Sequence, residues 1–182
     1  QDATGVIAEF VDRRTGSPIG AWRGDLLVGA DGIHSVVRRS VYPDEGAPHW
    51  TGQRMWRAVS RTKPILDGKT MVVIGHRRHK LVAYPIDAAP AADGSIAVNW
   101  IAELTFDNEV TPPREDWNKQ RPIADFAPQF SNWRFDWLDV PALFAGTEVA
   151  YEFPKVDREP MPHWSYGRVT LLGDAAHPMV PT

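Results

Sequence analysis

The sequence contains no cysteine. This absence excludes disulfide bonds, thiolate catalysis, and zinc or iron–sulfur sites built from cysteine. No apolar run approaches the roughly 20 residues that a membrane-spanning helix needs, and no secretory signal peptide is recognisable. The default prediction is a cytoplasmic protein without a membrane partner.

An excess of charge of one sign is also lacking. The 20 Lys and Arg residues face 23 Asp and Glu residues, which gives a formal net charge of -3. This balance offers no support for a nucleic-acid partner or an anionic membrane surface. The one basic run, residues 76–80, lies between two strand-like segments and is predicted to be a solvated hairpin tip. The sequence does not determine the oligomeric state.

One stretch combines a short strand with a polar turn. Residues 169–172 are β-branched or apolar and predict a buried strand that ends at Gly173 and Asp174. Glycine lets the backbone turn sharply or approach a ligand closely. A carboxylate just past a strand end is a fixed acceptor, and α/β sheets bind ligands at such ends. Asp174 is therefore a candidate for binding a sugar or polyol hydroxyl, and the alternative is a turn with a capping aspartate.

A second stretch repeats this order. The apolar residues 26–28 predict a strand covered on both faces, followed by Asp31, Gly32 and a helix that runs to about Val41. Asp31 is expected to cap that helix, whose N-terminus would favour an anion such as phosphate. Arg38 is expected to order the turn by pairing with an acid. The alternative for Arg38 is a solvated surface arginine.

Together the two stretches resemble the downstream fingerprints of the FAD-dependent aromatic hydroxylases, the class A flavoprotein monooxygenases. The first fingerprint is Asp31-Gly32 with Ser35 and Arg38, and the second is Gly173-Asp174 followed by Ala-Ala-His-Pro. Segments between them are similar to the phenazine-type branch of the family, which includes the monooxygenase of 5-methylphenazine-1-carboxylate. These segments include residues 68–71, 78–86, 98–100, 115–118 and 156–164.

The resemblance implies an FAD- and NAD(P)H-dependent monooxygenase that hydroxylates a small aromatic or N-heteroaromatic substrate through a flavin C4a-hydroperoxide. No catalytic triad or acid pair is expected, because the flavin carries the chemistry, and the catalytic residues are left unassigned. The resemblance also implies a central fragment, without the upstream Gly-x-Gly-x-x-Gly unit and the helix that follows residue 182. Such a fragment alone is expected to bind FAD poorly and to be inactive. The alternative is a non-catalytic flavin-fold module that binds a ligand or a partner.

The resemblance further assigns roles to individual residues. Asp174 would bind a ribityl hydroxyl of FAD, and the turn around it would let the backbone approach the cofactor near the isoalloxazine ring. The first turn would support the pyrophosphate and the nicotinamide cofactor. The cofactor-binding residues are therefore expected to be Asp31, Gly32, Arg38, Gly173, Asp174, Ala175 and Pro178.

Two aromatic residues are candidates for substrate contact. Tyr84, just before Pro85, can present its hydroxyl to a substrate, and Trp56 can serve as a stacking platform; the alternative for both is packing in the core. Arg54 or Arg57 can pair with a substrate carboxylate, and the alternative is a surface arginine on a strand.

The expected fold is α/β (α+β). Residues 1–45 and 165–182 are predicted to be part of a Rossmann-like FAD-binding domain, and residues 46–164 a mostly antiparallel β-sheet substrate domain with helices on one face. Besides those named above, strands are predicted at 5–12, 19–22, 53–62, 69–75, 80–86, 95–104 and 148–153, and helical segments at 111–117, 123–130 and 140–144.

Overall fold

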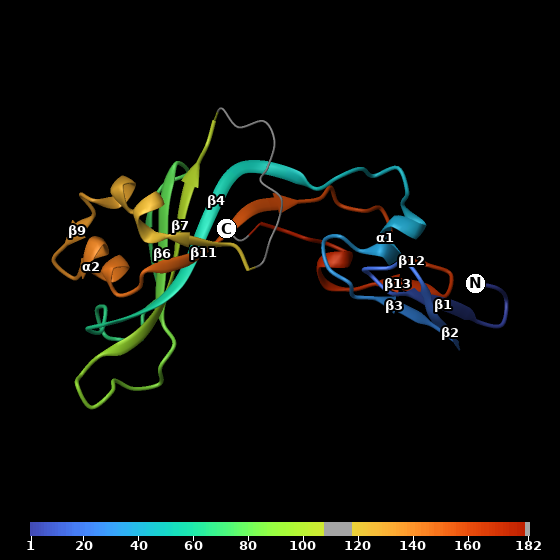
Figure 1. The fold of residues 1–182 in the computed structure, drawn as a ribbon, viewed down its shortest axis with the longest axis horizontal. Coiled ribbons are helices and arrows are strands. Elements are labelled where there is room, and N and C mark those ends of the chain that lie inside the picture. The colour runs from blue at the N-terminus through green and yellow to red at the C-terminus, as the bar shows by residue number, and fades with distance from the viewer. Residues whose placement is uncertain (108–117, 181–182) are drawn as a thin grey trace. The chain divides into compact units, whose positions relative to one another are not determined.

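The computed structural model describes residues 1–107 and 118–180 (Figure 1). The chain forms two compact units: Gln1–His49 with Val156–Thr182, and Trp50–Lys155. The boundaries predicted from the sequence lie after residue 45 and before residue 165. The structure groups residues 156–164 with the first unit, where Arg158 bonds to Ile33 and Glu45. The helix expected at 111–117 lies outside the described residues.

The first unit contains a hairpin and a small mixed sheet. In the hairpin, β1 (Val6–Val11) pairs antiparallel with β2 (Pro18–Gly24), and both lie where the sequence predicted strands. The mixed sheet has the strand order β12 (Ser165–Tyr166), β13 (Val169–Leu171), β3 (Leu27–Gly29). β12 and β13 are antiparallel, whereas β13 and β3 are parallel. The two strands predicted from the fingerprints are therefore direct neighbours.

Two short helical segments follow these strands. α1 (Val36–Val41) follows β3, and the 3-10 helix η3 (Gly173–Ala175) follows β13. α1 packs closely on the sheet, because a Cβ atom at Gly29 would lie only 2.7 Å from the Cβ of Val37. The expectation that residues 26–28 are covered on both faces is wrong for this chain: Val28 is 49% exposed.

The second unit is built on one six-stranded sheet. Every strand pair with a described register is antiparallel, so the prediction of a mostly antiparallel sheet is confirmed. A two-residue pair, β9 (Arg134–Phe135) and β10 (Leu138–Asp139), stands apart from it. The strand order is β5 (Val72–Gly75), β6 (His79–Pro85), β7 (Ile96–Thr105), β4 (His49–Thr62), β11 (Val149–Asp157), β8 (Gln120–Pro122).

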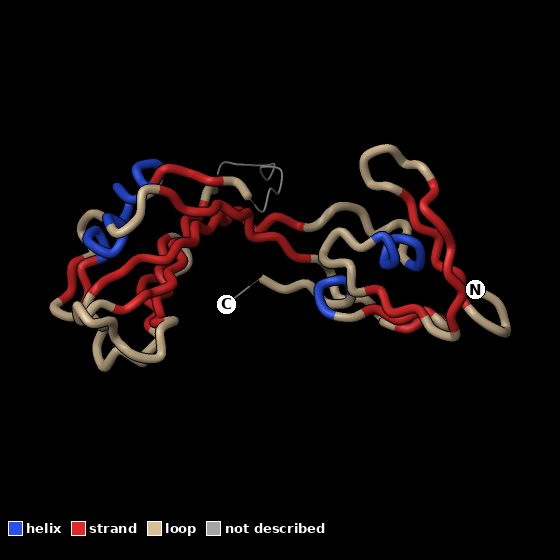
Figure 2. The backbone as a smooth tube through the Cα atoms, turned by 60° about the horizontal axis from the view of Figure 1, so that its bottom comes forward, coloured by secondary structure: helices blue, strands red, loops and turns tan. Residues whose placement is uncertain are grey.

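The helical segments of the second unit cover one face of this sheet, as predicted (Figures 1 and 2). They are the 3-10 helices η1 (Ile123–Asp125) and η2 (Ala127–Phe130) and the α-helix α2 (Val140–Ala145). Phe144 of α2 and Phe126, which lies between η1 and η2, pack on Trp100, with ring centroids 4.6 Å and 6.1 Å from that of Trp100. These contacts form the larger hydrophobic core of the chain.

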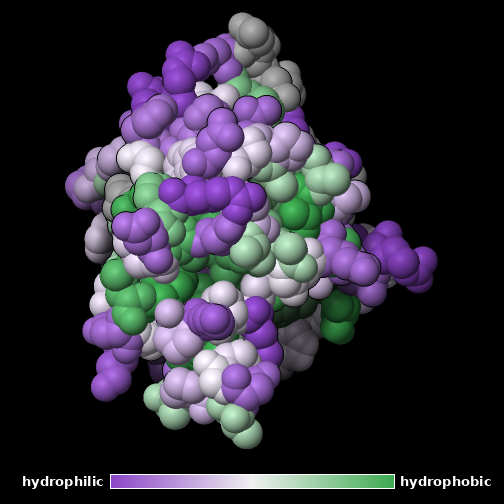
Figure 3. Space-filling model, turned by 90° about the vertical axis from the view of Figure 1, so that its left-hand side faces the viewer, coloured by the Kyte–Doolittle hydropathy of each residue, from purple (hydrophilic) through white to green (hydrophobic). Residues whose placement is uncertain are grey.

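The outer surface of this helical layer is mixed in character. On the side that carries α2 and β9, hydrophobic and polar atoms alternate over short distances (Figure 3). Among the described residues, none of the helices is both long and apolar enough to span a bilayer.

Candidate functional site

The turns that carry Asp31 and Asp174 leave the same edge of one sheet. β3 and β13 run parallel, with Gly29 opposite Leu171. Leu172 continues the pairing, because its N–H donates to the carbonyl oxygen of Gly29 over 2.9 Å. Parallel neighbours end at a common edge, where α/β sheets bind ligands. The structure thus brings together the two fingerprints that are far apart in the sequence.

Asp31 organises the first turn through its carboxylate. Its Oδ1 accepts a hydrogen bond from Ser35 Oγ, and its Oδ2 accepts from the N–H of Val36 over 2.7 Å and of Val37 over 3.3 Å. Ser35 is the N-cap of α1, and its Oγ accepts from the N–H of Arg38 over 2.8 Å. Asp31 therefore shares the capping role predicted for it with Ser35, and α1 begins later than predicted.

This arrangement affects the pKa of Asp31 and the N–H groups at the start of α1. Partial burial opposes ionisation of Asp31, but the hydrogen bonds from Ser35 and from the backbone of Val37 and Val36 outweigh it and lower the pKa of the carboxyl group. The first N–H groups of α1 are already taken by the side chains of Asp31 and Ser35. The helix start consequently has no N–H groups left there for the phosphate that the sequence suggested.

Arg38 is buried, with 1% of its surface exposed, and each nitrogen of its guanidinium donates to a protein acceptor. Nε donates to Glu45 Oε2 over 2.8 Å, and Nη2 donates to Glu45 Oε1. Nη1 donates to the carbonyl oxygens of Ala175 over 3.1 Å and Ala176 over 2.9 Å. The prediction that Arg38 pairs with an acid is confirmed, and the surface alternative is wrong. Arg38 joins the first turn directly to the second.

A second arginine completes this network. Arg158 Nη1 donates to Glu45 Oε2 over 2.9 Å, and Arg158 Nε donates to the carbonyl oxygen of Ile33 over 2.7 Å. Burial, together with the charges of Arg38 and Arg39, lowers the pKa of Arg158, although Glu45 opposes that effect. Glu45 thus bridges two arginines. Glu45 and Arg158 were not among the residues predicted from the sequence, because their partners in this network are distant in the chain.

The second turn combines an open backbone with a free carboxylate. Gly173 has φ +60°, and a Cβ atom there would meet no atom within 4 Å. The next residue, Asp174, is exposed, and its carboxylate accepts no hydrogen bond from the described part of the chain. Ala175 and Pro178 are buried behind it. An available acceptor beside an open glycine turn fits a polyol hydroxyl such as those of the FAD ribityl chain.

Gly32 in the first turn has a similar opening. Its φ is +79°, a conformation that favours glycine, and no atom lies within 4 Å of an added Cβ. Both turns at this strand edge therefore leave space beside their glycines.

Tyr84 and Trp56, the two predicted substrate residues, lie on opposite faces of the six-stranded sheet. Trp56 and Leu81 both pair with Ala102, so these three side chains share a face. Tyr84 is three residues after Leu81 and pairs with Asn99 on the other face. One substrate on a face of this sheet cannot contact both, so the structure separates the two predicted contacts. Arg54 and Arg57 are separated in the same way.

The face that carries Tyr84 also carries a buried ionic cluster. Glu103 Oε2 lies 3.1 Å from Lys80 Nζ and 3.1 Å from Lys155 Nζ. The side chains of Glu103 and Lys155 are 4% and 3% exposed. Charges buried to this extent need close partners, because they have lost their hydration. This cluster was not predicted from the sequence, although strand alternation places Lys80 and Tyr84 on one face.

The whole chain, residues 1–182, matches the family model described as an FAD binding domain. The chain belongs to this family. Among proteins of known activity, this chain is 37% identical over 179 residues to the phenazine 1,6-dicarboxylic acid hydroxylase PhzS of Lysobacter antibioticus. That match covers 98% of this chain and 44% of the relative. This chain is also 30% identical over 171 residues to the 6-hydroxynicotinate 3-monooxygenase of Bordetella bronchiseptica. That match covers 86% of this chain and 39% of the relative.

Solved structures show the same fold. The HpxO protein of Klebsiella pneumoniae, crystallised with FAD and uric acid, superposes with a TM-score of 0.74 at 25% identity, over 100% of this chain and 42% of its own. A salicylate hydroxylase in complex with substrate gives a TM-score of 0.68 at 21% identity, over 97% and 44% of the two chains. The chain spans less than half the length of these relatives.

Proposed function

We propose that the protein carrying this chain is an FAD-dependent monooxygenase that uses NAD(P)H to hydroxylate an aromatic or N-heteroaromatic substrate. The observation that carries the proposal is the parallel pairing of β3 and β13, which brings both fingerprint turns to one strand edge. FAD, reduced by NAD(P)H, supplies the oxygen-activating chemistry. The chain's own residues bind and orient the cofactor and the substrate.

In this proposal the second turn holds the ribityl part of FAD. The free carboxylate of Asp174 accepts a hydrogen bond from a ribityl hydroxyl, and Gly173 leaves room for the cofactor to approach the backbone. Ala175 and Pro178 are buried and support the shape of this turn. An ionised acceptor forms a stronger hydrogen bond than a neutral one, which favours aspartate at this position.

Asp31, Gly32 and Arg38 support the site in different ways. Gly32 leaves space for the cofactor. Asp31 and Arg38 are positioning residues, because their hydrogen bonds go to other parts of the protein. We propose that they hold the two turns together near the FAD pyrophosphate and the nicotinamide cofactor, without contacting a phosphate themselves.

The unit of residues 50–155 is proposed to bind the substrate, and the remaining unit to bind FAD. Tyr84 presents its hydroxyl on the sheet face that the helical segments leave uncovered, next to Asn99. Lys80, held by Glu103, adds a positive charge to that face. This combination suits a substrate with a ring hydroxyl or carboxylate. Trp56, on the other face, is not part of this substrate site.

The test measures flavin reduction and oxygen uptake by the purified full-length protein with NADH or NADPH. Aromatic and N-heteroaromatic carboxylates and phenols are supplied one at a time. The expected result is a substrate that accelerates flavin reduction and is recovered as its hydroxylated product. A protein that retains FAD but reduces it equally with and without every substrate, and forms no product, contradicts the proposal and favours a binding module.

A further inference from the structure

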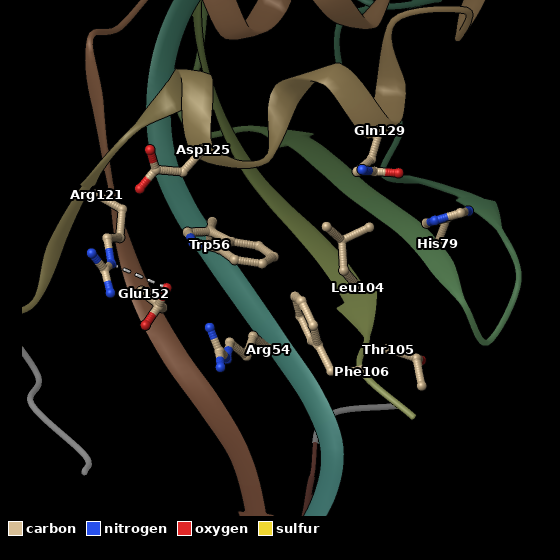
Figure 4. A pocket seen from close by; sticks show the side chains of 10 residues that line it. All are labelled: Arg54, Trp56, His79, Leu104, Thr105, Phe106, Arg121, Asp125, Gln129 and Glu152. Carbon is tan, nitrogen blue, oxygen red and sulfur yellow. Dashed lines mark ion pairs between the residues drawn. The ribbon is translucent and has the colours of Figure 1, made fainter. Parts of the chain in front are cut away.

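A cavity of about 410 Å³ lies on the helix-covered face of the second unit, away from the face that carries Tyr84 (Figure 4). Its floor is the sheet, and one rim is formed by residues of η1 and η2. This volume lies within the range of small-molecule sites in proteins. The lining residues that matter below are Trp56, Phe106, Arg54, Arg121, Asp125 and Glu152.

The floor of the cavity is aromatic. Trp56 stacks on the buried Phe126, with the ring centroids 4.7 Å apart and the planes at 14°. Phe106 lies beside Trp56 at 6.3 Å in an edge-to-face arrangement. Packing on Phe126 fixes the orientation of the Trp56 ring. A rigid aromatic floor suits a planar ligand.

Trp56 also contributes an unsatisfied donor. The residue is 3% exposed, and its Nε1 has no hydrogen-bond partner among residues 1–107 and 118–180. By contrast, Nε1 of Trp100 on the same face donates to Ser60 Oγ over 2.9 Å. A buried indole N–H normally has a partner, and indole can only donate. The missing partner of Trp56 is therefore an acceptor.

The wall beside Trp56 is rich in donors. Glu152 is 3% exposed, and it pairs with Lys119 and, over 3.4 Å, with Arg121 Nε. Burial opposes its ionisation, but Lys119, Arg121 and Arg54 outweigh that effect and lower the pKa of Glu152. The carboxylate is thus ionised and surrounded by cations. The pairing of Arg121 uses its Nε and leaves its Nη groups available to a further acceptor.

Other groups at the rim of the cavity do not reverse its preference for a ligand with a hydrogen-bond acceptor. Asp125 lines the cavity but is exposed, so its charge is hydrated. Arg54 lies over the ring of Phe106, with Cζ 4.7 Å from the ring centroid, and adds a cation to the same wall. A ligand must therefore combine a flat apolar part with an acceptor that faces Trp56 and Arg121. A carboxylate on an aromatic ring meets both requirements.

We propose that this cavity is a second small-molecule site, which binds a planar aromatic carboxylate. The ligand ring packs against Trp56 and Phe106, whose planes are inclined at 62° to each other, and the carboxylate accepts from Trp56 Nε1 and an Nη group of Arg121. The site is separate from the substrate site proposed at Tyr84, because the two residues are on opposite faces of the sheet.

The test follows the indole ¹H–¹⁵N signals of the full-length flavoprotein labelled with ¹⁵N-tryptophan. The signal of Trp56 is assigned by its disappearance in Trp56→Phe. Titration with 1-naphthoate is expected to shift this signal in a saturable way. The variant Arg121→Gln is expected to raise the dissociation constant read from the shift about tenfold, through loss of a charge-assisted hydrogen bond.

The controls separate this site from the proposed function. The variant Tyr84→Phe is expected to leave the Trp56 shift and its midpoint unchanged, whether or not the protein hydroxylates any substrate. The amine 1-naphthylmethylamine, which has no acceptor, is expected to give no shift. The proposal is overturned if 1-naphthoate does not move the Trp56 signal at millimolar concentration, if the amine moves it equally, or if Arg121→Gln has no effect on the midpoint.

Discussion

Arg38 Nη1 donates to the carbonyl oxygen of Ala176 over 2.9 Å, although the two residues are 138 positions apart in the chain. This bond joins the helix that follows the first fingerprint to the turn of the second. The same guanidinium is held from the other side by Glu45, which also binds Arg158. The spacing between the two turns therefore depends on a buried ionic network as well as on strand pairing.

Replacing Arg38 by Lys is expected to destabilise the protein. A lysine has three N–H donors at one point and cannot satisfy Glu45 and the carbonyl oxygens of Ala175 and Ala176 together. Because these acceptors are buried, we expect a loss of about 3 kcal/mol in the free energy of unfolding, measured by urea denaturation. The matched control is Arg39→Lys at the exposed neighbouring position, expected to change stability by less than about 0.5 kcal/mol. Equal effects at both positions would show that the network has no special role.

Gly29 is expected to tolerate no larger side chain. A Cβ atom there would lie 2.7 Å from Val37 Cβ and 2.9 Å from Leu171 Cδ2. Gly29→Ala must therefore push α1 away from the sheet, at a cost of about 1–3 kcal/mol. At Gly24 the nearest atom to an added Cβ is 3.6 Å away, so Gly24→Ala serves as the control. Thermal unfolding of both variants checks this prediction, which fails if their midpoints coincide.

The pKa shift of Asp31 predicts a pH dependence of stability. Its pKa is lower in the folded protein than in the unfolded chain, so the folded state prefers the ionised form. This contribution is complete above the ordinary aspartate pKa of about 4 and is lost as the pH falls through the lower folded value. Stability curves of the wild type and Asp31→Asn are therefore expected to differ at pH 7 and to converge in acid. A constant difference at all pH values would contradict this account.

Tyr84→Phe tests the substrate face. Loss of the hydroxyl is expected to raise KM for the hydroxylated substrate about tenfold, if that hydroxyl bonds to a charged substrate group. FAD occupancy is expected to stay unchanged, because Tyr84 lies in the second unit. Tyr42→Phe in the first unit is the control for removal of a tyrosine hydroxyl. Steady-state kinetics of both variants give the result, and an unchanged KM in Tyr84→Phe excludes the proposed contact.

Much of the fold could be predicted from the sequence, because apolar alternation and turn residues are local signals. The strands β1 and β2, the strands β5 to β7 and the helix α2 were predicted in this way. The start of α1 was placed too early, since Asp31 and Ser35 are both good caps and only the structure shows which one begins the helix. The prediction that the strand at residues 26–28 is covered on both faces was wrong, because Val28 is exposed in this chain.

The candidate site was predicted only in part. Asp174 and Asp31 could be recognised because a glycine and a carboxylate follow each strand. Glu45 and Arg158 could not, because their partners are distant in sequence and their own segments have the composition of linkers. The opposite orientation of Tyr84 and Trp56 depends on the register between β4, β6 and β7, which a single sequence does not specify.

The central claim is that the turn at Asp174, at the carboxyl end of β13, binds FAD. The most direct measurement is the ratio of flavin to protein absorbance in purified full-length Asp174→Ala, with a titration of added FAD. We predict a dissociation constant for FAD at least about tenfold above the wild type. The exposed Asp25, before the amino end of β3, is the control, and Asp25→Ala should bind FAD normally. Wild-type FAD affinity in Asp174→Ala would contradict the account.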